Sequence, residues 1–128
     1  MRKRRESDMK LMIPVDENRL ETNVCVSFGR APWFLLYDTE AKQAEFLENT
    51  AAQAEGGAGL KAAQIVVDSG AEALLTVRCG QNAAQVLQAA DIRIYRTQGS
   101  GVQENLEAFQ AGKLELMTKF HAGYHGLR

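Results

Sequence analysis

The stretch LLTVRCGQNAAQVLQAADIRIY, residues 74–95, limits the possible folds more than any other part of the chain. It predicts a short apolar strand over 73–77, a helix over 81–91 and a second strand over 92–97. Apolar residues in this helix recur at the spacing of one helical stripe, at Ala83, Val86, Leu87 and Ala90. A strand, a crossover helix and a strand form a right-handed unit with parallel strands. The segment therefore predicts an α/β domain.

The first third of the chain predicts a β-meander. Runs of strand-forming residues give expected strands at 10–16, 33–40 and 43–49. Pro14 lies inside the first run, and because proline cannot donate a ladder hydrogen bond, we expect a bulge there. The second and third strands should pair antiparallel around a short turn.

Two more helices complete the predicted order. A glycine-rich loop leads into one helix that ends near Gly70, and Gly112 should end the last one. Ser100 and Gln103 fit a capping box at the start of the last helix, whose buried stripe is expected at Val102, Leu106 and Phe109. The order β-β-β-α-β-α-β-α predicts a three-layer α/β/α domain with a mixed five-stranded sheet.

Charge and length suggest a single domain over 9–115, between a basic disordered tail, 1–8, and a C-terminal tail, 116–128. The net charge is −1, but the first eight residues carry +2, which leaves −3 on the rest. The body thus lacks the basic stripe that a nucleic acid would need. No apolar run is long enough for a membrane span or an export signal, so we expect a cytoplasmic protein whose Cys25 and Cys79 stay reduced.

Two irregular segments could bind a ligand. The first, VCVSFGRAPWF, brings Cys25, Ser27 and Arg30 together and is either a binding loop or an ordinary turn. Arg30 could hold an anion or form a surface ion pair. The second, EGGAGLKAAQ, places glycines before a helix, at Gly56, Gly57 and Gly59. Their amides could face an anion, or the glycines could provide a flexible entry to the helix.

Cys79 follows a buried strand and precedes a helix, which is where open α/β domains place ligands. The helix N-terminus is expected to lower the pKa of this thiol and make it a ligand or a nucleophile. No base can be placed beside it, which argues against catalysis. His121 and His125 lie four residues apart and could share a metal or simply be solvated. Neither Asp16 nor Asp38, near strand ends, belongs to a convincing two-metal cluster.

The motifs SFGRAPWFLLYD and ENTAAQAEGGAGLKAAQIVVDSGAEALLTVRCGQNAAQVLQAADIRIY together resemble the dinitrogenase iron-molybdenum cofactor biosynthesis family, which includes NifX-type accessory proteins. The resemblance implies a ribonuclease-H-like fold and a non-enzymatic binder or carrier of an iron–sulfur or iron–molybdenum cluster precursor, with other cofactor-assembly proteins as partners. The pocket it implies is lined by Cys25, Ser27, Arg30, Gly56, Gly57, Gly59, Cys79 and Asn82. The candidate metal ligands are Cys25, Cys79, His121 and His125.

The chain also departs from the family pattern. Members often have histidine before Phe-Gly-Arg, where this chain has Ser27, and a Gly-Pro-Asn-Ala turn where it has the Cys79 turn. Loss of that histidine removes a natural ligand and leaves open a cluster-free interaction or regulatory module on the same fold. A metal-dependent nuclease or phosphoryl-transfer enzyme is disfavoured by the missing acids at the strand ends and by the acidic body.

Overall fold

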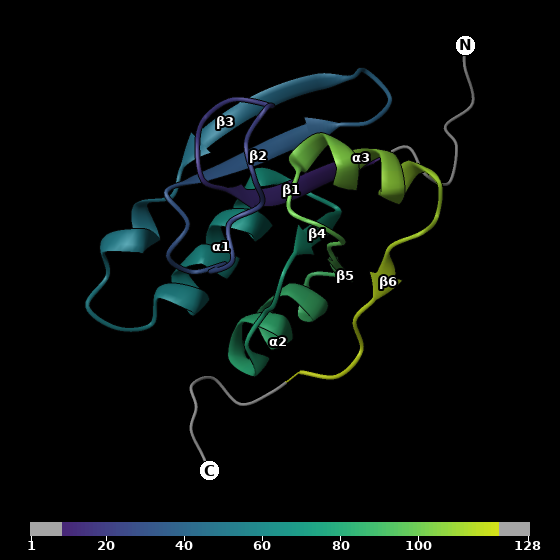
Figure 1. The fold of residues 1–128 in the computed structure, drawn as a ribbon. Coiled ribbons are helices and arrows are strands. Elements are labelled where there is room, and N and C mark those ends of the chain that lie inside the picture. Colours follow the sequence, from purple (N-terminus) through teal and green to yellow (C-terminus); the bar gives the residue numbers. More distant parts are fainter. Residues whose placement is uncertain (1–8, 121–128) are drawn as a thin grey trace.

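The computed structural model describes residues 9–120, in which a mixed six-stranded sheet is combined with three α-helices (Figure 1). The strands are β1 (Lys10–Val15), β2 (Trp33–Asp38), β3 (Gln43–Glu48), β4 (Ala73–Thr76), β5 (Arg93–Arg96) and β6 (Glu115–Leu116). The helices are α1 (Ala58–Ser69), α2 (Gln81–Ala89) and α3 (Val102–Gln110). A 3-10 turn, Thr50–Gln53, which the sequence did not indicate, follows β3.

The strand order is β3-β2-β1-β4-β5-β6. The first three strands form the predicted antiparallel meander, and β1, β4 and β5 are parallel, as the crossover helices require. The prediction of five strands is wrong, because β6 pairs antiparallel with the end of β5. A strand of two residues has too little alternation to be recognised in a sequence. β6 spans the boundary predicted between the domain, 9–115, and the C-terminal tail, 116–128.

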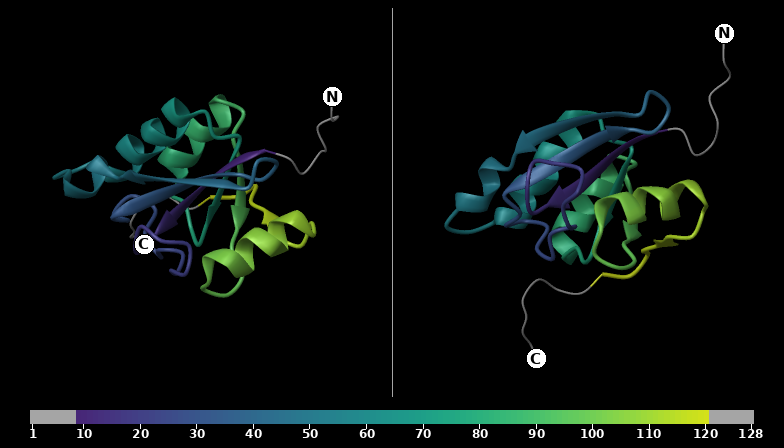
Figure 2. Two further views of the ribbon diagram at one scale, coloured as in Figure 1. Left: turned by 90° about the horizontal axis from the view of Figure 1, so that it is seen from above. Right: turned by 45° about the horizontal axis from the view of Figure 1, so that its top comes forward.

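The helices cover both faces of the sheet, which gives the predicted three layers (Figure 2). One core contains α1, α2 and the sheet residues Met12, Phe34, Leu74 and Ile94. The other contains α3, the loop after β1 and the sheet residues Leu11, Ile13, Leu35 and Leu75. The likeness to ribonuclease H stays a prediction. No helix within residues 9–120 is long and apolar enough to span a membrane.

Pro14 interrupts the hydrogen bonds on one side of β1 without a bulge. The register with β2 is continuous through Pro14, which pairs with Phe34, so the expected bulge is absent. The Lys10 carbonyl accepts from the Glu72 N–H (2.8 Å), so alternate residues of β1 turn their backbone groups towards β4. At Pro14 this side has no N–H, and its carbonyl accepts instead from Cys25 N–H (2.8 Å). The loop after β1 therefore replaces β4 as the neighbour of β1 there.

The helix limits differ little from the predicted ones. In α2, Ala83 and Leu87 are buried as expected, but Val86 is half-buried, Ala90 is exposed and Ala84 is buried instead. In α3 the predicted cap is displaced by one residue. The N-cap is Gly101, and the Glu104 carboxylate accepts from the Gly101 N–H (3.3 Å) in place of the Ser100–Gln103 pair. Val102 and Phe109 are buried, Leu106 is half-buried, and the fully buried Asn105 joins them.

Candidate functional site

The loops that follow the parallel strands β1, β4 and β5 all leave from one edge of the sheet, the edge formed by the carboxyl ends of these strands. The pairs Val15–Trp33 and Trp33–Glu48 place the end of β1, the start of β2 and the end of β3 at that edge. Since β4 and β5 run parallel to β1, the turn at Cys79 and the start of α3 also lie there. We call the loop over 16–32, between β1 and β2, the first loop. The predicted ligand residues between 25 and 82 all lie in segments that meet at this edge.

The first loop packs directly on the start of α1 at two glycines. A Cβ on Gly29 would lie 3.0 Å from the Gly59 nitrogen and 3.1 Å from its Cα. A Cβ on Gly59 would lie 3.9 Å from the Cβ of Ala83, in the first turn of α2. The first loop and the beginnings of α1 and α2 are therefore neighbours. This contact is why the chain has glycine at position 29, in the SFGR segment.

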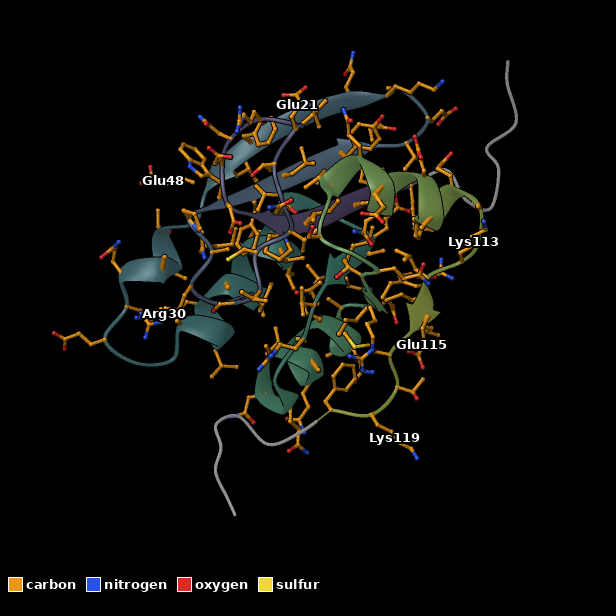
Figure 3. The ribbon with its side chains drawn as sticks, viewed as in Figure 1. Glu21, Arg30, Glu48, Lys113, Glu115 and Lys119 are labelled. Carbon is orange, nitrogen blue, oxygen red and sulfur yellow. The ribbon has the colours of Figure 1, made fainter. Side chains whose placement is uncertain are left out.

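Asn49 and Arg30 tie the first loop to the segment after β3. The buried Asn49 amide donates to the carbonyls of Gly29 (3.1 Å) and Ala31 (2.8 Å), while its oxygen accepts from Ala51 N–H (3.0 Å). Arg30 Nη1 donates to the carbonyls of Ala52 (2.9 Å) and Ala54 (2.6 Å) (Figure 3). Arg30 therefore does not form the predicted surface ion pair with any described residue. Its Nη1 donates to two backbone carbonyls, so the position of this side chain is explained without a ligand.

The N-termini of α1 and α2 are open. Their N-caps are Gly57 and Gly80, neither helix has a side-chain cap, and neither has an acidic residue in its first turn. The first N–H groups of a helix have no partner within the helix. Within residues 9–120, no side-chain acceptor replaces one for either helix. Two sets of N–H donors, with the positive ends of two helix dipoles, therefore lie side by side at this edge, an arrangement that suits an anion.

Both cysteines are buried free thiols, each with 9% of its surface exposed. Burial raises the pKa of Cys79 to about 12, so the expectation that the helix N-terminus would lower it is wrong. Its Sγ contacts the Gly80 carbonyl (3.7 Å), and its side chain belongs to the core beneath α1 and α2. Burial, and then the Asp16 carboxylate, raise the pKa of Cys25, although the backbone at Ser27 lowers it. Both thiols are therefore protonated at neutral pH.

The remaining predicted residues differ in how well the structure supports them. Ser27 accepts from the Arg30 N–H (3.2 Å) and so shapes the first loop, and Asn82 lies exposed in the first turn of α2. Asp16 and Asp38 lie at opposite ends of the β1–β2 pair. His121 and His125 lie outside the described residues. Within 9–120, no three His, Cys, Asp or Glu side chains are grouped to hold a metal ion.

Asn49 is the residue of this edge that the sequence reasoning missed. It closes the third predicted strand and looked like an ordinary polar strand end. The signal that could have identified it is an asparagine two residues before Ala51, a spacing typical of an Asx turn, ahead of a glycine-rich loop.

Comparisons with known proteins identify one matching family and several similar proteins. A family profile described as dinitrogenase iron-molybdenum cofactor matches residues 9–112. An uncharacterised protein of Methanocaldococcus jannaschii is 31% identical over 110 residues, which cover 84% of this chain and 90% of that protein. The apo form of the orange protein from Desulfovibrio gigas has a TM-score of 0.82 at 31% identity, covering 86% of this chain and 93% of the other. A Thermotoga protein described as a candidate NifB protein has a TM-score of 0.78 at 39% identity, covering 91% and 99%.

Proposed function

The chain belongs to the dinitrogenase iron-molybdenum cofactor family, and we propose that it is a non-enzymatic binding or carrier protein for an iron–sulfur or iron–molybdenum cluster precursor. The family relates to the iron-molybdenum cofactor of dinitrogenase, and one similar structure is described as an apo form. The cluster precursor would be held at the edge of the sheet that carries the first loop, with cofactor-assembly proteins as donor or acceptor.

The observation that carries this proposal is the pair of open helix N-termini beside the first loop. Cluster precursors with sulfide ligands are anions whose outer atoms accept hydrogen bonds. The starts of α1 and α2 supply N–H donors without a competing carboxylate, and Gly29 lets the first loop approach them closely. Such a site would bind a preassembled anion better than a single metal ion, for which residues 9–120 offer no group of three ligands.

The thiols would coordinate a cluster only after they lose their protons. Cys25 and Cys79 are the thiols within the described residues, but each is protonated in the ligand-free protein. Coordination by either thiol would release a proton, so affinity would rise with pH. Binding through N–H groups alone would leave affinity independent of pH in the range where the thiols stay protonated. The proposed metal ligands outside the described residues are His121 and His125.

Anaerobic reconstitution with ferrous iron and sulfide tests the proposal. We expect visible absorption and bound iron in the wild-type protein after gel filtration, at pH 7 and at pH 8.5. Lower absorption in Cys25→Ala or Cys79→Ala, with uptake that rises between the two pH values, would identify that thiol as a ligand. Equal absorption in all three proteins would remove both cysteines from the ligand set but keep the N–H site. No iron uptake by the wild-type protein in either condition, together with no retention of a preassembled iron–sulfur cluster added in place of iron and sulfide, would refute the carrier function.

The second candidate is a cluster-free interaction or regulatory module. It is favoured by Ser27 in place of the histidine frequent in the family and by Arg30, whose Nη1 already serves two carbonyls. A protein that is purified without colour or metal, takes up no iron, and is retained by an immobilised cofactor-assembly protein would support this module. Retention that depends on prior iron loading would instead support the carrier.

A further inference from the structure

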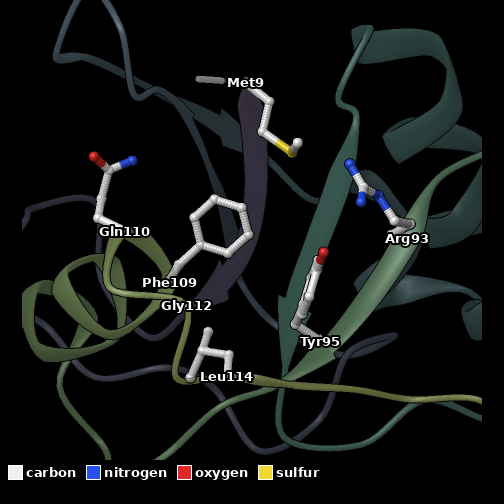
Figure 4. A pocket seen from close by; sticks show the side chains of 7 residues that line it. All are labelled: Met9, Arg93, Tyr95, Phe109, Gln110, Gly112 and Leu114. Atoms are coloured by element: carbon white, nitrogen blue, oxygen red, sulfur yellow. The ribbon is translucent and has the colours of Figure 1, made fainter. Parts of the chain in front are cut away.

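A cavity of about 300 Å³ lies at the other edge of the sheet, where the parallel strands begin, away from the candidate site. It opens between β5 and the end of α3, on the face of the sheet that α3 covers (Figure 4). Its lining residues are Met9, Arg93, Tyr95, Phe109, Gln110, Gly112 and Leu114. This volume is at the lower end of the range that small-molecule sites occupy. None of the residues assigned to the cluster site contributes to it.

Two features of the sequence border the cavity. At this level of the sheet, β4 lies between β1 and β5 and contributes Ala73, which pairs with Leu11 on one side and Arg93 on the other. Ala73 is fully buried in the same core as Met9, Phe109 and Leu114. After α3, Gly112 has a φ of +72°, and the chain returns to the sheet, where β6 pairs with β5. The cavity lies between β5 and the segment that leaves α3.

The walls of the cavity are chemically divided. Met9, Phe109 and Leu114 are between 6% and 8% exposed and form an apolar floor. Arg93 and Tyr95 lie two residues apart on β5, so both face the cavity, and Figure 4 shows the guanidinium and the hydroxyl on the same side of it. The Tyr95 ring is held edge-on against Phe109, with centroids 5.2 Å apart. Among residues 9–120, no acidic side chain lines the cavity.

We propose that this cavity binds a small carboxylate with an apolar body. Arg93 would accept the carboxylate in its planar fork of N–H donors, Tyr95 would donate its hydroxyl hydrogen to a carboxylate oxygen, and the apolar body would cover the floor. Because none of the described residues that line the cavity is acidic, the positive charge of Arg93 favours an anionic ligand over a cationic one. The site is independent of the cluster site, so either proposal can fail without the other.

Titration of the full-length ¹⁵N-labelled protein with octanoate, followed by NMR, tests this inference. We expect saturable shift changes at Arg93, Tyr95 and Leu114, and binding at least tenfold weaker for octanamide, which has the same body without the charge. Arg93→Gln should weaken octanoate binding about tenfold. Tyr95→Phe, which keeps the ring against Phe109, should weaken it about threefold.

Arg96→Gln is the matched control. Arg96 lies on the same strand but faces the other side of the sheet and pairs with Glu115 (3.4 Å), so octanoate binding should not change. The proposal is overturned if octanoate produces no saturable shifts at the cavity, if octanamide binds as tightly, or if Arg96→Gln weakens binding as much as Arg93→Gln. Each of these results can be read on folded protein, because the two β5 substitutions in the cavity leave the buried floor intact.

Discussion

The three helices all begin with an N-cap glycine at the same edge of the sheet, yet one N-terminus is closed and two are open. At α3, the Glu104 carboxylate accepts from Gly101 N–H, and the Val102 N–H donates to the Thr22 carbonyl (3.1 Å). At α1 and α2, no side chain of residues 9–120 and no acidic first-turn residue takes that place. The same chain therefore caps one helix N-terminus with a carboxylate and leaves the two adjacent N-termini uncapped within the described residues. The uncapped pair suits an external anion.

The first loop belongs to both regions. Its first part is bound to α3, where Val24 N–H donates to the Ser100 carbonyl (2.8 Å) and Asn23 bridges to Gly101. Its later part lies on the opposite face, where Phe28 joins the core beneath α1 and α2. We call the α3 side of the sheet the closed region and the side of α1 and α2 the open region. The closed region holds the first part of the loop in place, and the later part of the loop lies in the open region. Three substitutions and a change of pH test this division between the closed and the open region.

Asn105→Ala should disrupt the closed region most. The fully buried Asn105 side chain accepts from Gln98 N–H (2.7 Å) and donates to the Gly101 carbonyl (2.8 Å). Its removal takes the acceptor from the Gln98 N–H and leaves an unfilled space at a fully buried position, while the Gly101 carbonyl still accepts from the Asn105 backbone N–H (3.2 Å). We expect the free energy of unfolding to fall by about 2 kcal/mol in urea titrations. The exposed Gln103→Ala on the same helix is the control. A loss no larger than that of the control would show that Asn105 does not hold the closed region.

Gly29→Ala should separate the first loop from α1. The new Cβ would meet backbone atoms of Gly59 and Ala58 at 3.0 to 3.2 Å, and backbone cannot rotate away as a side chain can. We expect a loss of about 2 kcal/mol in the free energy of unfolding and a lower iron uptake in reconstitution. Gly56→Ala is the matched control, since a Cβ there meets nothing within 4 Å. Uptake unchanged in Gly29→Ala would show that the loop contact is not needed for binding.

Alkaline pH should destabilise the open region through Cys79. The folded protein keeps this thiol protonated to about pH 12, whereas the unfolded chain loses the proton near pH 9. The stabilisation is therefore complete below pH 9 and is lost as the pH rises from 9 towards 12. Relative to Cys79→Ala, the wild-type free energy of unfolding should fall by about 1.4 kcal/mol per pH unit above pH 9. Parallel curves for the two proteins between pH 8 and 10.5 would contradict the assigned burial.

Gly80→Asp should convert an open N-terminus into a closed one. Gly80 has extended backbone angles (φ −71°, ψ 160°) that an N-cap side chain accepts without strain. The new carboxylate would accept hydrogen bonds from the first N–H groups of α2 and stabilise the protein by a few tenths of a kcal/mol. Because it occupies the place of an anion, it would also weaken anion uptake by about 1 kcal/mol. Gly80→Asn adds the same hydrogen bond without the charge. Iron uptake equal in Gly80→Asp and wild type would show that α2 does not face the ligand.

Much of the fold could be predicted because its signals are local. The strands from 10–16 to 92–97 and the helix end at Gly70 follow from period and turn chemistry, and the structure moves their limits by one or two residues. β6 could not be predicted, since its two residues pair only because α3 returns the chain to β5. Local pattern also failed at Pro14, where the missing N–H removes a bond to β4 rather than forming a bulge.

The candidate site was only partly predictable. Glycines and polar residues marked the right loops, but the reason for Gly29 is a contact with Gly59, thirty positions away, which no local pattern contains. The predicted direction of the shift in the Cys79 pKa was wrong for the same reason. A position before a helix suggests a low value, but the packing of α1 and α2 over the thiol decides it. The open N-termini could have been found, because neither first turn contains an acidic residue.

The bonds at Pro14 determine which substitutions the first loop tolerates. Backbone groups alone attach the loop to β1 here: the Pro14 carbonyl accepts from the Cys25 N–H, and the Asp16 N–H donates to the Asn23 carbonyl (3.1 Å). Every residue except proline supplies such an N–H, so the side chains that follow Cys25 are not needed to hold the loop at that point. A substitution of Ser27 therefore leaves this anchor of the loop in place.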